Sequence, residues 1–218
     1  MDQVDILLVK ESIFKNNDER AEILRDELKK KNLLFVNVMS SPGSGKTTTL
    51  CGIIDALKDK LNIAVMEADI DSDCDAKKVQ ATGARVIQLH TGGMCHLDSD
   101  MTRQGLDKMG IDGIDLCFLE NIGNLVCPAE FDTGAHLNMV ILSIPEGDDK
   151  PIKYPLMFKV ANIVVINKID TLPIFDFDID KCIKSIHDLN KDAKIFLVSA
   201  KTKEGINELS NYLALYKI

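Results

Sequence analysis

LLFVNVMSSPGSGKTTTL, residues 33–50, is an apolar run followed by a glycine-rich turn and then by the start of a helix. A strand that leads through GSGKT into a helix is the context in which a P-loop binds phosphate. Gly43 and Gly45 let the backbone curl so that its N–H groups face phosphate oxygens, and the dipole of the helix adds to the attraction. Serine at position 40 replaces the usual first glycine, and a small residue still fits there. The residues predicted to bind the phosphates are Gly43, Ser44, Gly45, Lys46, Thr47 and Thr48.

Short apolar runs alternate with longer amphipathic ones after this motif. Strands are predicted at 33–39, 62–68, 84–89, 115–120, 138–144, 162–167 and 194–198. Helices are predicted at 46–60, 74–81, 97–109, 178–189 and 204–216. Apolar strands separated by helices indicate βαβ units and a parallel sheet covered on both faces. The predicted fold class is α/β, a P-loop NTPase with a mostly parallel sheet flanked by helices.

Two stretches do not fit this alternation. Residues 3–31 place Ile6, Ile23 and Leu28 among many charges, which predicts one or two amphipathic helices with a break near Lys15–Asp18. We therefore expect an N-terminal helical extension at 1–31 and a P-loop domain at 32–218. EGDDKPIKYP, residues 146–155, is predicted to be a loop, because proline and acidic residues interrupt both periodicities.

The composition is that of an ordinary globular protein with an acidic surface. Hydrophobic residues make up 45% of the 218 residues, and the formal net charge is −8. An acidic surface repels phosphate backbones, so we expect no nucleic-acid partner. We also expect no signal peptide and no membrane span, because the longest apolar runs are short and the N-terminus mixes charges with apolar residues. A cytoplasmic protein with its six cysteines as free thiols is the simplest interpretation.

Lys46 is expected to reach the β- and γ-phosphates, and the Thr47 hydroxyl is expected to bind Mg²⁺. Glu120 ends the apolar run IDLCFLE, where P-loop proteins hold the carboxylate that acts on Mg²⁺ directly or through water. The sequence ENIG, residues 120–123, has the spacing of the loop that senses the γ-phosphate. It contains no glutamine to position water, so we expect slow hydrolysis.

A second acidic segment, ADIDSDCDAKK at 68–78, crowds four aspartates together. At least two of them are expected to be solvated, because four carboxylates beside a triphosphate would repel it. Asp69 and Asp75 are favoured as the residues that orient water or the metal. Magnesium is predicted to be held by Thr47, Asp75 and Glu120.

The base is predicted to be guanine. Residues 161–170, ANIVVINKID, are an apolar strand that ends in Asn-Lys-Xaa-Asp. The two oxygens of Asp170 suit the N1–H and N2–H₂ donors of guanine, whereas adenine would leave this carboxylate unpaired. A second strand ends in Ser-Ala-Lys, which fits another loop against the base. The residues predicted to contact the base are Asn167, Lys168, Asp170, Ser199, Ala200 and Lys201.

HTGGMCHLDSD at 90–100 and ENIGNLVCP at 120–128 contain the thiols and imidazole that suit Zn²⁺ or Ni²⁺. The spacing of Cys95 and Cys127 is a weak signal by itself, and ordinary loop thiols are the alternative. Because Cys127 follows the segment expected to sense the γ-phosphate, metal and nucleotide binding would be coupled. The predicted nickel or zinc ligands are Cys95, His96 and Cys127, whereas His90, His136 and His187 are expected to be structural or solvated.

SSPGSGKTTTL, ADIDSDCDA, GGMCHLDS, ENIGNLVCPAEFD, DKPIKYP and NKID, taken in this order, resemble the hydrogenase nickel-incorporation GTPases, the HypB family. The resemblance spans roughly residues 33–201. It implies that GTP is hydrolysed to GDP as nickel is delivered to a [NiFe]-hydrogenase large-subunit precursor, together with an accessory protein. The family belongs to dimerising P-loop GTPases that include the urease accessory GTPase. That relative typically carries Cys-Pro-His, whereas this chain has Cys95-His96-Leu97-Asp98.

The residues predicted to act in hydrolysis are Lys46, Asp69, Asp75, Glu120 and Lys153. The Lys153 charge is expected near the nucleotide, supplied from a second subunit, and a solvated loop lysine is the alternative. Many members of the family carry a cysteine-rich or histidine-rich N-terminal metal tract, and this sequence shows neither. Three other functions stay open: a urease-type nickel chaperone, a GTPase that guards a cobalamin enzyme, and a nucleotide-gated interaction module with inert cysteines.

Overall fold

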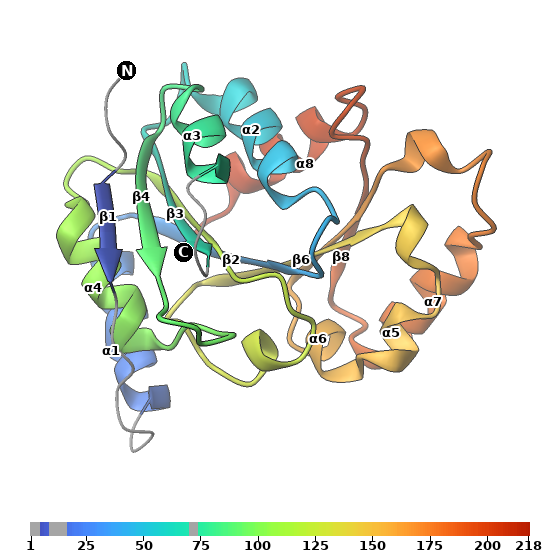
Figure 1. Ribbon diagram of the computed structural model, residues 1–218, viewed down its shortest axis with the longest axis horizontal. Coiled ribbons are helices and arrows are strands. Elements are labelled where there is room, and N and C mark those ends of the chain that lie inside the picture. The colour runs from blue at the N-terminus through green and yellow to red at the C-terminus, as the bar shows by residue number, and fades with distance from the viewer. Residues whose placement is uncertain (1–4, 9–16, 70–73) are drawn as a thin grey trace.

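Eight parallel strands form one sheet in the computed structural model, which describes residues 5–8, 17–69 and 74–218 (Figure 1). The strand order is β1-β4-β3-β5-β2-β6-β7-β8, and every neighbouring pair is parallel. Their bounds are β1 Asp5–Leu8, β2 Leu34–Ser40, β3 Ile63–Asp69, β4 Arg85–His90, β5 Leu116–Glu120, β6 Leu137–Ser143, β7 Ile163–Asn167 and β8 Lys194–Leu197. The seven strands predicted after residue 32 are confirmed, each within about two residues.

Helices cover both faces of the sheet (Figure 1). On one face lie α2 Lys46–Leu57, α3 Cys74–Gln80 and α8 Ile206–Leu215. The other face carries α1 Asn17–Lys30, α4 Ser99–Met109, α6 Pro155–Lys159 and α7 Ile179–Leu189. The five predicted helices are all present, and the predicted α/β class is confirmed. None of the helices in the described ranges is long and apolar enough to cross a membrane.

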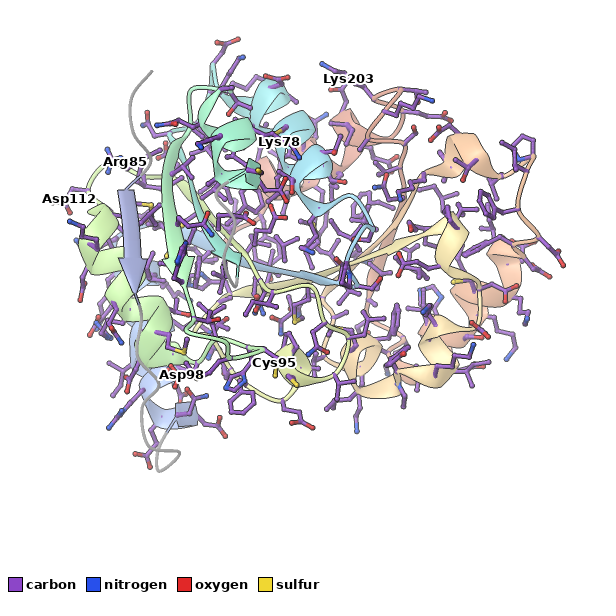
Figure 2. All side chains as sticks on the ribbon, in the orientation of Figure 1. Lys78, Arg85, Cys95, Asp98, Asp112 and Lys203 are labelled. Carbon is purple, nitrogen blue, oxygen red and sulfur yellow. The ribbon has the colours of Figure 1, made fainter. Side chains whose placement is uncertain are left out.

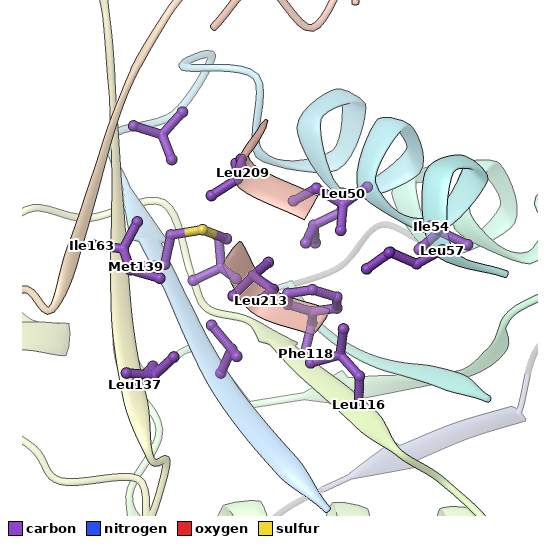
Figure 3. Packing of buried hydrophobic residues seen from close by; sticks show 14 of the residues in the cluster. Leu50, Ile54, Leu57, Leu116, Phe118, Leu137, Met139, Ile163, Leu209 and Leu213 are labelled. Carbon is purple, nitrogen blue, oxygen red and sulfur yellow. The ribbon is translucent and has the colours of Figure 1, made fainter. Parts of the chain in front are cut away.

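The core lies between the sheet and these helices, because most strands are buried on both faces. All seven residues of β2 are buried. Alternate side chains of the central strands pack against α2 and α8, as Figure 3 shows for Leu50 and Ile54 of α2, Leu213 of α8 and Phe118 of β5. This double burial explains why the strands are apolar throughout instead of alternating.

The helices predicted within residues 3–31 are correct for one helix, α1, and wrong for residues 5–8. Asp5–Leu8 form β1, which pairs in parallel with β4 at the edge of the sheet. Four residues are too few to show strand periodicity, and the nearby charges gave them a helical appearance. The second predicted helix is α1, with Leu24 and Leu28 buried against the sheet. The division of the chain at residue 31 stays a prediction.

The loop predicted at 146–155 is also partly wrong. Lys150–Lys153 form the short helix α5, which follows the 3₁₀ turn η2 Ile144–Glu146. Pro151 lies in the first turn of α5, where the missing N–H of proline costs nothing. The backbone N–H of Lys153 donates to the carbonyl of Asp149 over 3.0 Å, which closes that turn. Proline therefore lies in the first turn of a helix here, whereas the sequence pattern predicts that it interrupts regular structure.

His136 joins three elements just before β6. Its Nδ1 accepts from the backbone N–H of Phe35 over 3.1 Å, and its Nε2 lies 3.1 Å from the carbonyl oxygen of Arg25. The ring must therefore be neutral, with its proton on Nε2. Burial lowers the pKa of His136 from 6.5, and the charges of Arg25 and Lys29 lower it further, against the hydrogen bond to Arg25.

A group whose pKa is lower in the folded than in the unfolded state stabilises the fold fully above its unfolded pKa. We therefore predict that His136 makes the free energy of unfolding decrease as the pH falls below about 6.5. His136→Gln should flatten this part of the curve in urea unfolding at several pH values. The matched control is His187→Gln, because His187 is exposed. A His136→Gln protein with the parent's pH slope would contradict the prediction.

Candidate functional site

The P-loop lies between the central strand β2 and α2. Gly45 precedes α2 with a φ of 98°, a left-handed conformation that favours glycine. A Cβ at this position would lie 2.6 Å from Nδ2 of Asn167. Glycine is therefore required both by the backbone and by the close approach of the base-binding loop.

Ser40 explains how the loop is held where the motif usually has glycine. The side chain is fully buried, and its Oγ accepts from the Ser44 hydroxyl over 2.6 Å. The same oxygen lies 3.1 Å from Nζ of Lys46. The Ser40 hydroxyl thus holds the lysine ammonium over the loop in which the phosphates are expected.

Three carboxylates gather beside this loop. Glu120 at the end of β5 accepts from the Thr47 hydroxyl over 2.8 Å. Glu67 on β3 is the register partner of Glu120, so both side chains point to the face that carries α2. Glu67, Asp75 and Glu120 each offer an oxygen within 4.8 Å of the others. They line a pocket of about 280 Å³ together with Gly43, Lys46 and Gly123.

The buried carboxylates in this pocket favour the binding of a cation. Glu67 and Glu120 are 3% and 2% exposed, and one oxygen of each has no hydrogen-bond partner among the described residues. Burial, and then the neighbouring Glu120, hold the pKa of Glu67 well above its usual range. Burial also raises the pKa of Glu120, although the hydrogen bond with Glu67 and the charge of Lys46 oppose this. Two buried carboxyls in contact retain a proton unless a cation replaces it. These oxygens and the Thr47 hydroxyl are the hard donors that Mg²⁺ prefers.

Asn167 connects the segments predicted to contact the base to the P-loop. The side chain is buried, and its Nδ2 donates to the carbonyl of Ser44 over 2.9 Å. Its Oδ1 accepts from the backbone N–H of Ala200 over 3.1 Å. Lys168 has a φ of 62°, and its Nζ lies 2.6 Å from the carbonyl oxygen of Gly43. The structure therefore brings the NKID and SAK segments together beside the P-loop, as the sequence predicts.

Among the described residues, the carboxylate of Asp170 accepts a hydrogen bond at one of its two oxygens. Its Oδ1 accepts from the Ser199 hydroxyl over 2.6 Å, and Ser199 also accepts from the backbone N–H of Thr202 over 3.1 Å. The hydroxyl fixes the carboxylate plane at the edge where guanine donors are expected. Lys201 is exposed, and Thr48 is exposed on α2.

Two of the predicted soft ligands, Cys95 and Cys127, come together from two loops, whereas His96 does not complete with them a group of three ligand atoms within 4.8 Å among the described residues. A hydrogen-bonding interaction with the Cys127 thiol is the largest cause that raises the pKa of Cys95, followed by burial. Cys95 is exposed, and Cys127 is half-buried at the start of the 3₁₀ turn η1 Cys127–Ala129. His96 is buried and stacks on Phe131, with ring centroids 3.6 Å apart. Figure 2 shows Cys95 and Asp98 on the side of the sheet that carries α1 and α4, away from Lys78 on α3.

Two predicted catalytic residues are not placed at the phosphates. Asp69 ends β3, and its side chain lies outside the described residues, as do the neighbouring aspartates at 71 and 73. Lys153 is exposed on α5 and forms an ion pair with Asp149 at 2.5 Å. It is not among the residues that line the carboxylate pocket. The roles predicted for Asp69 and Lys153 stay predictions.

Comparison with known proteins gives consistent relatives. Residues 34–197 match the CobW/HypB/UreG nucleotide-binding domain family. The hydrogenase maturation factor HypB of Escherichia coli K12 is 41% identical over 98% of this chain and 73% of its own length. The probable hydrogenase maturation factor HypB of Methanocaldococcus jannaschii is 39% identical over 98% of this chain and 96% of its own length. This chain belongs to the HypB family.

A solved HypB structure agrees with this assignment. The crystal structure of HypB from Helicobacter pylori in complex with nickel has a TM-score of 0.86 and 37% identity, covering 92% of this chain and 94% of that one. The resemblance drawn from the motifs is thus confirmed. The P-loop domain of this HypB-family chain is a nucleotide-binding domain.

Glu67 is the residue of the carboxylate pocket that sequence reasoning missed. The signal was a single acidic residue inside the apolar run IAVMEAD, two positions before the end of a strand. A buried strand rarely contains an unpaired carboxylate, so this glutamate indicates a polar partner. Only the register between β3 and β5 shows that the partner is Glu120.

We predict that Asp170→Asn weakens GTP binding by about tenfold or more, because an amide cannot accept from both guanine donors. Binding of xanthine nucleotides should improve, since their ring offers a carbonyl where guanine has its amine. Fluorescent-nucleotide titrations measure both affinities, and Asp192→Asn on the exposed surface is the matched control. GTP affinity equal to the parent's would contradict the assignment of Asp170.

We predict that Glu67→Gln raises the Mg²⁺ concentration needed for half-maximal binding of a GTP analogue by about tenfold, because glutamine keeps the shape and removes one charge. Without Mg²⁺ the variant should bind the analogue at least as well as the parent, since less negative charge then faces the phosphates. Glu208→Gln on the exposed face of α8 is the control. An unchanged Mg²⁺ requirement would remove Glu67 from the metal site.

Proposed function

We propose that this chain is a GTP-hydrolysing metallochaperone that binds nickel or zinc at Cys95, His96 and Cys127 and inserts nickel during maturation of a [NiFe]-hydrogenase. The observation that carries the proposal is that Cys95 and Cys127 interact across two loops, with the buried His96 next to Cys95 in the sequence. Two thiols brought together from loops 32 residues apart are a suitable ligand pair for a thiophilic ion. The relatives from E. coli and M. jannaschii are hydrogenase maturation factors, which supports hydrogenase as the recipient.

The metal is expected to lie on the axis of a homodimer. One chain supplies at most three soft ligands from this site, and a tetrahedral ion needs four. A two-fold interface presents the same patch twice, so six ligands meet and can hold two ions, or one ion with ligands to spare. Cys95 is exposed, which leaves its thiol accessible to a second copy.

The nucleotide is expected to control the metal through residues 120–127. Glu120 bonds to Thr47 at the start of this segment, and Cys127 lies at its end. A Cβ on Gly123 would lie 3.0 Å from Cγ of Pro42, so the segment packs closely on the P-loop. Filling the γ-phosphate position would press on this contact and shift Cys127. GTP would then align the ligands, and hydrolysis would loosen them for release.

Hydrolysis itself is expected to use Mg²⁺ held by Thr47, Asp75 and Glu120, with Lys46 on the phosphates. When bound, the ion would neutralise charge that develops on the phosphate oxygens. Asp75 is half-buried and pairs with Lys78 at 2.6 Å, so it must exchange this partner to bind the ion. Lys153 from a second subunit is the candidate for an additional positive charge.

A second recipient is favoured by other relatives. The proteins from Helicobacter hepaticus and Helicobacter pylori, 39% and 38% identical, are hydrogenase/urease maturation factors. A nickel site of the same design could therefore serve urease. The sequence Cys95-His96-Leu97-Asp98, in place of Cys-Pro-His, favours hydrogenase.

The test is a Ni²⁺ titration with and without a non-hydrolysable GTP analogue, with the oligomeric state measured at each point by light scattering. We expect Ni²⁺ stoichiometry and the dimer fraction to rise together when the analogue is added. Cys95→Ala and Cys127→Ala should each lose Ni²⁺ binding and keep GTP hydrolysis. Cys74→Ala, which removes another exposed thiol, should behave like the parent.

Two outcomes would contradict this. Retention of Ni²⁺ by Cys95→Ala or Cys127→Ala would remove the proposed ligands. Equal binding of Ni²⁺ to a nucleotide-free monomer would refute the shared, GTP-dependent site, although the three ligands would survive as a site within one chain.

A further inference from the structure

Asn17, the first residue of α1, lies between the two loops that carry the cysteines. Its Oδ1 accepts from the backbone N–H of Ser99 over 3.0 Å and from the Ser99 hydroxyl over 2.8 Å. Its Nδ2 donates to the carbonyl of Asp132 over 2.9 Å. Ser99 comes three residues after His96, and Asp132 comes five residues after Cys127. One side chain therefore binds both metal-site segments at once.

Besides the interaction of Cys95 with Cys127, the two segments meet where two rings stack near the residues that Asn17 binds. His96 stacks on Phe131, and Phe131 immediately precedes Asp132. Asn17 therefore holds the backbone of Asp132, the residue directly after Phe131, whose ring packs against the imidazole of His96. Asn17 and the stacked rings together define the separation of the two loops.

Arg25, two turns further along α1, supports the same segment. Its guanidinium forms two bonds with the carboxylate of Asp132, at 2.6 and 2.7 Å, and its Nε donates to the carbonyl of Ala135 over 2.8 Å. Both bonds to the carboxylate come from Nη2 of Arg25, so this charge-assisted contact restricts the distance between α1 and Asp132. The segment after Cys127 is therefore held to α1 by both its backbone and its side chains.

We infer that Asn17 is a positioning residue for the Cys95, His96 and Cys127 site, which holds the two loops at the separation that metal binding requires. This inference rests on the proposed metal role of those three residues. A carboxamide donates from its nitrogen and accepts at its oxygen at the same time, whereas an ionised aspartate of the same shape can only accept. Asn17 can therefore bind Ser99 and Asp132 together, and no substitution of similar size preserves both bonds.

Neighbouring contacts provide the comparison that isolates this effect. Glu27 of α1 pairs with Arg103 of α4 at 2.7 Å. This pair also connects α1 to α4, but neither residue belongs to the loop after Cys127. Breaking it loosens the docking of α1 and leaves the Asn17 bridge intact.

The experiment compares the parent with Asn17→Ala, Asn17→Asp and Glu27→Gln. Asn17→Asp removes the donor to Asp132 and adds one negative charge, and an acidic residue in the first turn keeps α1 stable through the helix dipole. Ni²⁺ affinity is measured by competition with a chromophoric chelator, and the thiolate-to-nickel charge-transfer band reports the coordination geometry. GTP-analogue affinity and the thermal midpoint are measured on the same samples.

We expect both Asn17 variants to bind Ni²⁺ about tenfold more weakly, with an altered charge-transfer band and the parent's GTP-analogue affinity. Glu27→Gln should match the parent in affinity and spectrum. Parent-like Ni²⁺ binding by Asn17→Asp would overturn the inference, and so would an equal loss in Glu27→Gln. A parent that binds no Ni²⁺ would overturn the proposed metal role itself, which distinguishes the two failures.

Discussion

The buried amide of Asn167 is the interaction on which the nucleotide site depends. It bonds to the P-loop through the carbonyl of Ser44 and to the segment after β8 through the N–H of Ala200. Gly45 leaves just enough room for it, since any Cβ would clash with its Nδ2. The loop for phosphate and the loops for the base therefore cannot move independently. A mutation at any of these positions would therefore change the geometry of both the phosphate loop and the loops expected to contact the base.

Because all strands are parallel, their carboxyl ends meet at one edge of the sheet, and loops from distant parts of the chain converge there. The soft and hard donors are nevertheless kept apart. The carboxylates of Glu67, Asp75 and Glu120 gather on the face of the sheet that carries α2 and α3, whereas Cys95 lies on the side of α1 and α4. Under the proposed function, this separation would place a hard cation and a thiophilic ion with the donors that suit each. Residues 120–127 are the shortest stretch of the described chain that joins the first group to the second.

Much of this architecture could be predicted from the sequence, because each strand and helix has a local pattern. The P-loop, the NKID strand and the predicted ligands are also local motifs. What could not be predicted depends on contacts between distant residues. Glu67 acquires its meaning from its register with Glu120, and Asn17 from bonds to residues 82 and 115 positions away. β1 was missed because four residues next to charges do not form a recognisable period.

The position of β2 has a consequence for how the chain folds. This strand carries the P-loop, yet its two neighbours in the sheet, β5 and β6, begin only at Leu116 and Leu137. During synthesis the first half of the chain leaves the ribosome with an apolar strand that has no partner. Pairing across such distances is slow, because the closure of a long loop must precede the gain in contacts. The centre of the sheet therefore closes late, and the newly made chain passes through a stage at which its apolar central strand needs protection from aggregation.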